Sequence, residues 1–199
     1  PLAELNLAHT AVGDATVEAL AGKRTLHTLR LDQTSVGDGA LAALQTLPLV
    51  ELGLSYSSLR TTTLEKLSAI GTLEVLAVAG LPIDDAGLAP LSRLLRLREL
   101  DLGETKIAGD GLAALAGLRG LRVLDLAQTV VGGDALTALA PLHLVELRLA
   151  STHVDDASLT RLGRMNSLAT LILDGTPIGD TGVAELVPVP RLSELGLQA

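Results

Sequence analysis

The sequence predicts a curved α/β solenoid, formed by a single elongated domain over residues 1–199. A parallel sheet lines its concave face and short helices line its convex face. Two observations predict this fold. A leucine recurs every 23 or 24 residues along the whole chain. Within each unit, the apolar residues alternate at first, as in a half-buried strand, and are then spaced by three, as along one stripe of a helix. Chains with such internal periods stack their units side by side.

Each unit opens with this leucine, from which we count positions as offsets. Eight complete repeats open at residues 2, 26, 49, 73, 97, 121, 144 and 168, and a partial ninth opens at residue 192. No linker or low-complexity stretch interrupts the series. The sequence starts within a repeat and stops just after an expected strand, without polar end caps, so we expect it to be a piece of a longer chain.

The fifth repeat illustrates the strand part of each unit. Leu100 and Leu102 stand at offsets 3 and 5, and the residues around them alternate with them. This period of two predicts a short strand with one buried face. The side chains at offsets 2, 4, 6 and 7 are expected to face solvent on the concave side.

The second part of each unit predicts a short helix or helical turn. Leucines spaced by three form its buried stripe, as at Leu88, Leu91 and Leu94. An aspartate usually precedes the stripe, and we expect it to cap its own helix by accepting from free N–H groups of the first turn. These aspartates are Asp14, Asp38, Asp85, Asp110, Asp134, Asp156 and Asp180, and Thr61 is expected to do the same in the third repeat.

The run Leu97-x-x-Leu100-x-Leu102-x-x-Thr105-x-Ile107 resembles the leucine-rich repeat family, and similar runs cover nearly all of the chain. The family pattern usually has Asn or Cys at offset 8, bonded to backbone between rungs. Here Thr or Ser stands there in seven of eight repeats, and we expect its hydroxyl to form a similar ladder. Val36–Leu41 and Ile178–Val183 are similar to helix-containing bacterial and ribonuclease-inhibitor-like repeats.

Composition narrows the classes of protein further. Hydrophobic residues make up 48% of the chain, Tyr56 is its one aromatic residue, and it has no Cys. The absence of Cys excludes disulfides and Cys-based metal sites. Since secreted members of the family often carry disulfide caps, it favours a cytoplasmic or bacterial-effector setting. No apolar run approaches the ~20 residues that span a bilayer, so no membrane insertion is expected.

The predicted concave face carries ten acids and two arginines, Arg30 and Arg148. This balance equals the net charge of −8 for the whole chain. At offset 2, Glu stands on every second rung, which keeps like charges about 10 Å apart. The ten acids are Glu4, Asp32, Glu51, Glu99, Asp101, Glu104, Asp125, Glu146, Asp174 and Glu194.

We predict that this face attracts a basic protein partner, by steering and by ion pairing. The alternative is a solvated strand surface that serves only solubility. Tyr56 shares the face, and Tyr is favoured in contact hot spots. The candidate protein-binding residues are Glu51, Tyr56, Glu99, Asp101, Glu104, Asp125, Glu146 and Arg148.

Other chemistry finds little support in the sequence. The four histidines, His9, His27, His143 and His153, have no metal-ligand spacing, so no metal site is predicted. Weak attraction of a cation by the carboxylates around Asp101 and Asp125 is a minor alternative. No cofactor-binding or catalytic residue is predicted. The acidic balance argues against a nucleic-acid partner, which requires a basic stripe. The aspartate pairs at helix starts are explained by capping rather than by Ca²⁺.

Three functions remain open at this stage. Resemblance to the family implies a non-enzymatic scaffold that binds a protein on its concave sheet. The alternative is the substrate-recognition region of a larger enzyme or effector, of the ubiquitin-ligase adaptor type. A purely structural spacer is the third, and it predicts that neutralising the acidic residues abolishes no interaction.

Overall fold

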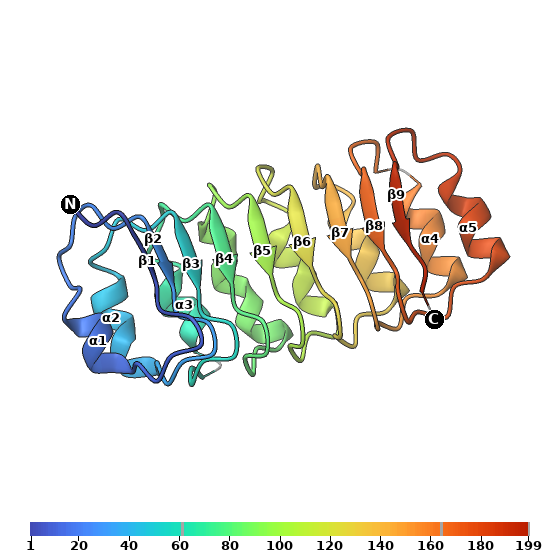
Figure 1. Cartoon of the computed structure of the whole chain (residues 1–199). Coiled ribbons are helices and arrows are strands. Elements are labelled where there is room, and N and C mark those ends of the chain that lie inside the picture. Colours follow the sequence, from blue (N-terminus) through green and yellow to red (C-terminus); the bar gives the residue numbers. More distant parts are fainter. Residues whose placement is uncertain (61, 164, 199) are drawn as a thin grey trace.

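A computed structural model of the chain describes residues 1–60, 62–163 and 165–198. Within these ranges, nine three-residue strands form one parallel sheet in which each strand pairs with the next in sequence (Figure 1). Each strand begins two residues after a repeat leucine, so the same offsets lie beside one another on neighbouring strands. The strands are β1 Glu4–Asn6, β2 Thr28–Arg30, β3 Glu51–Gly53, β4 Val75–Ala77, β5 Glu99–Asp101, β6 Val123–Asp125, β7 Glu146–Arg148, β8 Thr170–Ile172 and β9 Glu194–Gly196.

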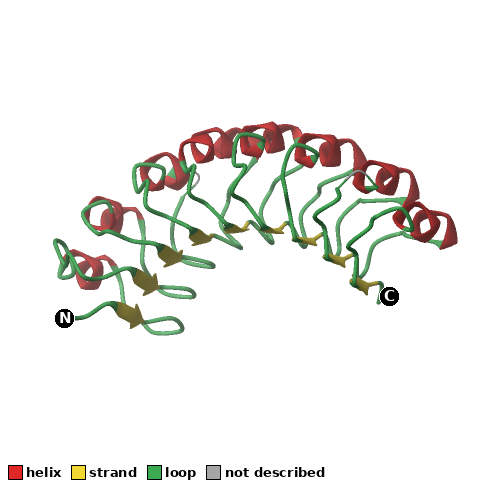
Figure 2. Cartoon of the chain, turned by 90° about the horizontal axis from the view of Figure 1, so that it is seen from above, coloured by secondary structure: helices red, strands yellow, loops and turns green. Residues whose placement is uncertain are grey.

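Short α and 3₁₀ helices form the second layer. They line the outer side of the arc while the strands line its inner side, which confirms the predicted solenoid (Figure 2). Parallel strands sit about 4.8 Å apart, whereas packed helices need about 8–10 Å, so the stack bends toward the sheet. The helices are α1 Asp14–Glu18, η1 Asp38–Ala40, α2 Leu41–Leu44, α3 Thr63–Leu67, η2 Asp85–Arg93, η3 Asp110–Leu115, η4 Gly133–Leu139, α4 Asp156–Leu162 and α5 Asp180–Leu186.

A continuous leucine core fills the space between the two layers. In the fifth repeat, Leu97, Leu102, Leu112, Leu115 and Leu118 are fully buried. Each buried leucine contributes about 1.5–3 kcal/mol, so stacked apolar side chains dominate the stability of the array. None of the described helices has the length and apolar composition to traverse a lipid bilayer.

The expected threonine ladder between rungs is wrong. Each threonine hydroxyl instead donates to the carbonyl three residues earlier in its own rung: Thr105 Oγ1 lies 2.6 Å from Leu102 O, and Thr129 Oγ1 lies 2.7 Å from Leu126 O. The same bond forms at Thr10, Thr34, Thr152 and Thr176. Thr at offset 8 therefore closes the turn after the strand, because its short side chain reaches only local backbone. The buried hydroxyl of Ser57 has no hydrogen-bond partner among the described residues.

The aspartates before the helices also act differently from the expectation. They are not caps. Six of the seven predicted aspartates are the first residue of a helix, and the cap position before them is held by Gly or by another Asp. Asp85 Oδ1 accepts from the N–H groups of Gly109 and Gly111 in the next rung, at 3.0 and 2.9 Å. Asp14, Asp38 and Asp156 likewise bond to backbone N–H groups of the next rung.

In two of the described helices, the residue just before the predicted aspartate caps the helix with its side chain. Asp84 accepts from Gly87 N–H, and Asp155 forms a capping box with Ser158. The expected cap Thr61 lies outside the described residues. Aspartate rather than threonine thus ties rung to rung along the edge of the solenoid where the helices begin.

Candidate functional site

The site begins with a turn that follows each of the strands β1 to β8. Residues at offset 7 have positive φ in all eight complete repeats, at Gly80 and Gly175 and at six residues that carry side chains: His9, Gln33, Tyr56, Glu104, Gln128 and Ser151. Offsets 6 and 7 therefore belong to a left-handed turn rather than to the strand. L-residues adopt this region reluctantly. It is fixed here because each N–H donates to a carbonyl of the next rung, as from Tyr56 N to Ala79 O at 2.8 Å.

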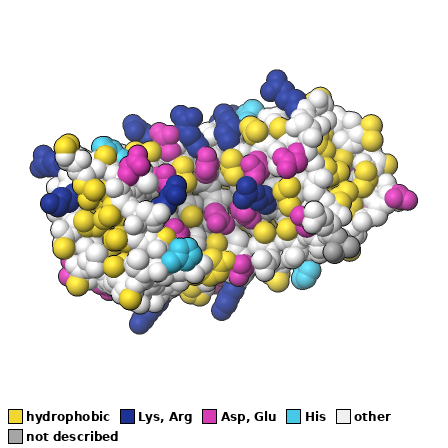
Figure 3. Space-filling view, viewed as in Figure 1, with side chains coloured by type: hydrophobic (Ala, Val, Ile, Leu, Met, Phe, Trp, Pro, Cys, Tyr) yellow, Lys and Arg dark blue, Asp and Glu magenta, His cyan; other side chains and the backbone are white. Residues whose placement is uncertain are grey.

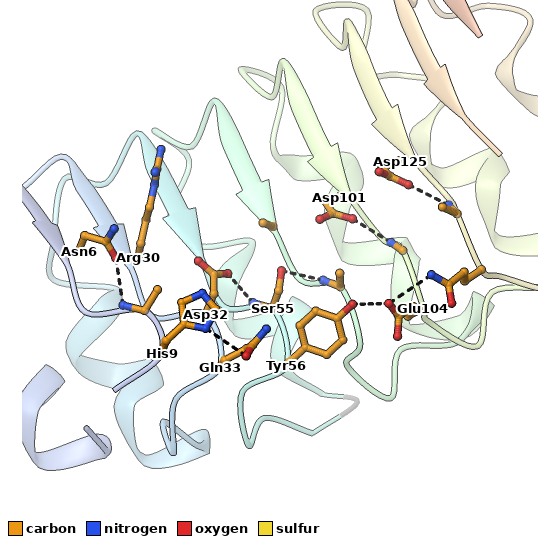
Figure 4. Close-up of a pocket in the computed structure, with 16 residues that line it drawn as sticks. Asn6, His9, Arg30, Asp32, Gln33, Ser55, Tyr56, Asp101, Glu104 and Asp125 are labelled. Atoms are coloured by element: carbon orange, nitrogen blue, oxygen red, sulfur yellow. Dashed lines mark hydrogen bonds between the residues drawn. The ribbon is translucent and has the colours of Figure 1, made fainter. Parts of the chain in front are cut away.

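Tyr56 uses this turn to reach across one whole rung. Its hydroxyl donates to the Glu104 carboxylate, two repeats further along the chain (Figure 4). The ring passes over Gly80, where a Cβ would collide with it. The Gln128 amide approaches the same carboxylate at 3.5 Å. Glycine at offset 7 of the fourth repeat thus permits a side-chain bridge that local sequence patterns do not reveal.

This bridge changes the acidity of the phenol. The hydrogen bond to Glu104 raises the pKa of Tyr56 to about 12, with burial and the charge of Glu104 acting in the same direction. The phenol therefore stays neutral at physiological pH and acts as a donor. Its side chain is still 43% exposed, so it remains open to a partner.

Asp101 and Asp125 form the centre of the site. They are register partners on the adjacent strands β5 and β6, and Arg148 follows at the same offset on β7. Burial raises the pKa of Asp101 above its usual value, the hydrogen bond from Gly103 N–H opposes this rise, and the charge of Asp125 adds to it. Arg148 approaches Asp125 at 3.4 Å and Glu146 at 2.6 Å.

The structure brings most of the predicted residues into two adjoining hollows on the concave face. Tyr56, Asp101, Glu104 and Asp125 share a groove of about 580 Å³, floored by small residues such as Ala77 and Ala127. Asp101 and Asp125 also line a second hollow of about 290 Å³ with Glu99, Glu146 and Arg148.

Glu51 lies outside both hollows. It is bound to Arg30 at 2.6 Å and lines a separate recess with Glu4. Several residues of the groove were not singled out as candidates from the sequence, among them His9, Gln33, Ser55 and Gln128. Their shared offsets, 6 and 7, are the signal that could have identified them, because the first six repeats present those positions to the same groove.

Polar groups in the groove are engaged mainly with one another and with backbone. Ser55 Oγ accepts from Ala79 N–H at 3.2 Å, and His9 Nδ1 lies 3.1 Å from Gln33 Oε1. Across the described ranges, no three His, Asp or Glu side chains converge in a way that could hold a metal ion. The arrangement therefore offers carboxylates and one phenol as contact groups.

Comparison with known proteins agrees with this architecture. Residues 97–116 match a family profile described as "Leucine Rich repeat". No curated protein matches the chain in sequence. Among solved structures, an internalin C2 from Listeria monocytogenes is similar with a TM-score of 0.77 and 24% identity, over 98% of this chain and 80% of that one. The fold is that of a leucine-rich repeat solenoid, and one repeat matches the family profile in sequence.

Two further solved structures share the fold at greater distance. The internalin InlF of the same bacterium has a TM-score of 0.68 and 20% identity, over 97% of this chain. The plant peptide hormone receptor RGFR1, solved in complex with RGF2, has a TM-score of 0.64 and 18% identity, over 100% of this chain. The chain spans 60% of the length of the InlF chain and 32% of the receptor chain.

Proposed function

We propose that the domain is a non-enzymatic scaffold that binds a basic segment of a partner protein in its acidic concave groove. The observation that carries this proposal is a set of three carboxylates, Glu99, Asp101 and Glu104. They lie on β5 and the turn after it, and within the described residues none of them has a cationic partner.

The distribution of arginine supports the same conclusion. Both arginines of the concave face form ion pairs with other carboxylates: Arg30 pairs with Glu51, and Arg148 pairs with Glu146 and Asp125. Magenta carboxylates lie across the middle of this face in the space-filling view (Figure 3). A lysine or arginine brought by a partner would therefore meet negative charge that the chain itself does not neutralise.

The shape of the groove suits an extended segment. Its lining runs from Asn6 on the first rung to Gln128 on the sixth, a distance of about 24 Å at about 4.8 Å per rung. An extended chain rises about 3.3 Å per residue, so roughly seven residues fill this length. Small side chains along the floor leave room for those of the partner, and Tyr56 offers an aromatic contact.

The distant likeness to RGFR1, described in complex with RGF2, supports a binding role only at the level of the fold. The charge of the proposed partner comes from the side chains of this chain.

Binding of a fluorescein-labelled Lys-Ser-Lys-Gly-Lys-Ser-Lys peptide tests the proposal by fluorescence anisotropy. Affinity should fall steeply as the Debye length shortens from about 30 Å to about 8 Å. The triple variant Glu99→Gln, Asp101→Asn, Glu104→Gln should lose about 3- to 150-fold in affinity, since each exposed close pair contributes about 0.2–1 kcal/mol.

A charge-matched control separates the groove from net charge. Glu18→Gln, Glu65→Gln and Asp110→Asn remove the same three charges from exposed positions outside the concave face. This control should keep its affinity within about twofold. An equal loss in both triple variants, or an affinity independent of salt, would refute the proposal.

A further inference from the structure

The edge of the solenoid from which the strands start carries the opposite charge to the groove. In the segments that join each helix to the next strand, the arginines include Arg96, Arg98, Arg119 and Arg122, with Glu74 as the acid beside them. In Figure 3, dark blue side chains stand along the upper edge, above the magenta ones of the concave face. We call Leu95, Arg96, Arg98, Arg119 and Arg122 the arginine patch.

Repeat geometry stacks the arginine patch on successive rungs. Glu74, Arg98 and Arg122 stand at offset 1 of three successive repeats. Backbone hydrogen bonds place them side by side: Arg98 N–H donates to Glu74 O and Arg122 N–H donates to Arg98 O, each at 2.7 Å. Their side chains therefore emerge about 4.8 Å apart. Glu74 balances one charge, as Arg98 Nε lies 2.9 Å from its carboxylate.

The remaining guanidinium groups have no carboxylate partner among the described residues. Arg122 Nη1 donates to the backbone carbonyls of Arg119 and Leu121, at 3.0 and 2.9 Å. These bonds hold its guanidinium group at the edge without neutralising it. Arg96 and Arg119 are exposed. The positive charge of the patch is thus unmatched within its own neighbourhood.

Leu95 adds an apolar contact at the centre of these charges. Its side chain is 68% exposed, while the adjacent Leu94 is fully buried and fills the core. Leu95 lines a hollow of about 340 Å³ with Arg96, Arg98 and Arg122. Leu95 therefore offers an apolar contact among these guanidinium groups, and an apolar side chain of a partner could pack against it.

We propose that the arginine patch binds a short acidic segment of a protein, with one apolar side chain placed against Leu95. Arginine forks pair well with carboxylates. Three rungs span about 10 Å, the length of about three extended residues. A nucleic-acid strand or an anionic membrane would extend past this length and meet the carboxylates of the concave face, beginning with the exposed Glu99, so the charge pattern favours a short peptide.

Anisotropy of a fluorescein-labelled Asp-Glu-Leu-Glu-Asp peptide tests this second interface. The double variant Arg96→Gln, Arg122→Gln should weaken saturable binding roughly tenfold, and Leu95→Ser should weaken it a few-fold. Lys23→Gln with Arg24→Gln removes the same charge from the same edge in the first repeat and should change affinity less than about twofold. Circular dichroism would check that all variants are folded.

Three results would overturn the assignment. The first is an absence of saturable binding to the intact chain. The second is an equal loss of affinity in the first-repeat control, which would indicate diffuse electrostatics. The third is tighter binding of a single-stranded oligonucleotide, or of vesicles containing phosphatidylserine, that the same two arginine substitutions weaken.

Discussion

Replacing Asp85 by alanine tests the way successive rungs are held together. Asp85 accepts three backbone hydrogen bonds from the next rung, from Ala108 at 3.1 Å, Gly109 at 3.0 Å and Gly111 at 2.9 Å. Gly109 is buried, and an orphaned buried N–H costs about 1–3 kcal/mol. The two more accessible donors can turn to water and lose about 0.5–1 kcal/mol each. We expect a total loss of about 2–5 kcal/mol in the free energy of unfolding.

Asp110→Ala provides the matched control. Asp110 is the first residue of η3, as Asp85 is the first residue of η2, so both variants lose the same favourable contact with a helix N-terminus. Asp110 is exposed and has no bond to the next rung within the described residues. Its replacement should cost no more than about 0.5 kcal/mol.

Urea unfolding followed by circular dichroism measures both variants on the same scale. We expect the free energy of unfolding of Asp85→Ala to be clearly lower than that of Asp110→Ala. If the two variants lost equal stability, the aspartates would act only through the helix ends, and the inferred tie between rungs would be refuted.

Three further predictions concern the core and the groove. Leu100→Ala should cost about 2–5 kcal/mol in urea unfolding, because Leu100 is 1% exposed and its loss opens a cavity; a loss below about 1 kcal/mol would contradict the packing. The phenolate absorbance of Tyr56 should titrate near pH 12, and Glu104→Gln should move the midpoint toward 10; an unchanged midpoint would exclude the bridge. Asp101→Asn should leave thermal stability at pH 7 unchanged or slightly raised, because the folded state disfavours the ionised carboxyl. Any gain should vanish as the pH falls and Asp101 takes up its proton, whereas a gain that grows in acid would reverse the sign.

Sequence periodicity was enough to predict the solenoid. Leu100 and Leu102 alternate along the strand, and Leu112, Leu115 and Leu118 are spaced by three along the helical part, so two periods assign the two layers. Repetition then fixes the register, since each strand starts at the same offset. The acids at offsets 2 and 4 could be placed on the concave side for the same reason.

Hydrogen-bond roles were harder to predict, because they depend on distances between rungs rather than on residue type. Judged by residue type alone, the side chains of Thr105 and Asp85 can each bond to backbone of their own rung or of the next rung. In the folded chain, the buried threonine reaches only its own turn, while the aspartate faces backbone N–H groups of the next rung. The bond between rungs predicted for threonine is therefore made by aspartate, while threonine closes the turn after its own strand.

The Tyr56–Glu104 bridge could not be predicted from the sequence of any single repeat. It joins residues 48 positions apart and depends on the missing side chain at Gly80. The left-handed turn at offset 7 carries no single residue type in this chain, because interstrand hydrogen bonds impose the conformation on His, Gln, Tyr, Glu and Ser alike.

Mapping the lysine peptide by NMR tests the central claim most directly. Isotope-labelled protein titrated with Lys-Ser-Lys-Gly-Lys-Ser-Lys should show its largest amide shifts in β5, in β6 and in the turns at Gly103–Glu104 and Ala127–Gln128. The amide signals of η3 and η4 on the convex face should keep their chemical shifts. Shifts concentrated on those helices, or spread evenly over the surface, would contradict binding in the acidic groove.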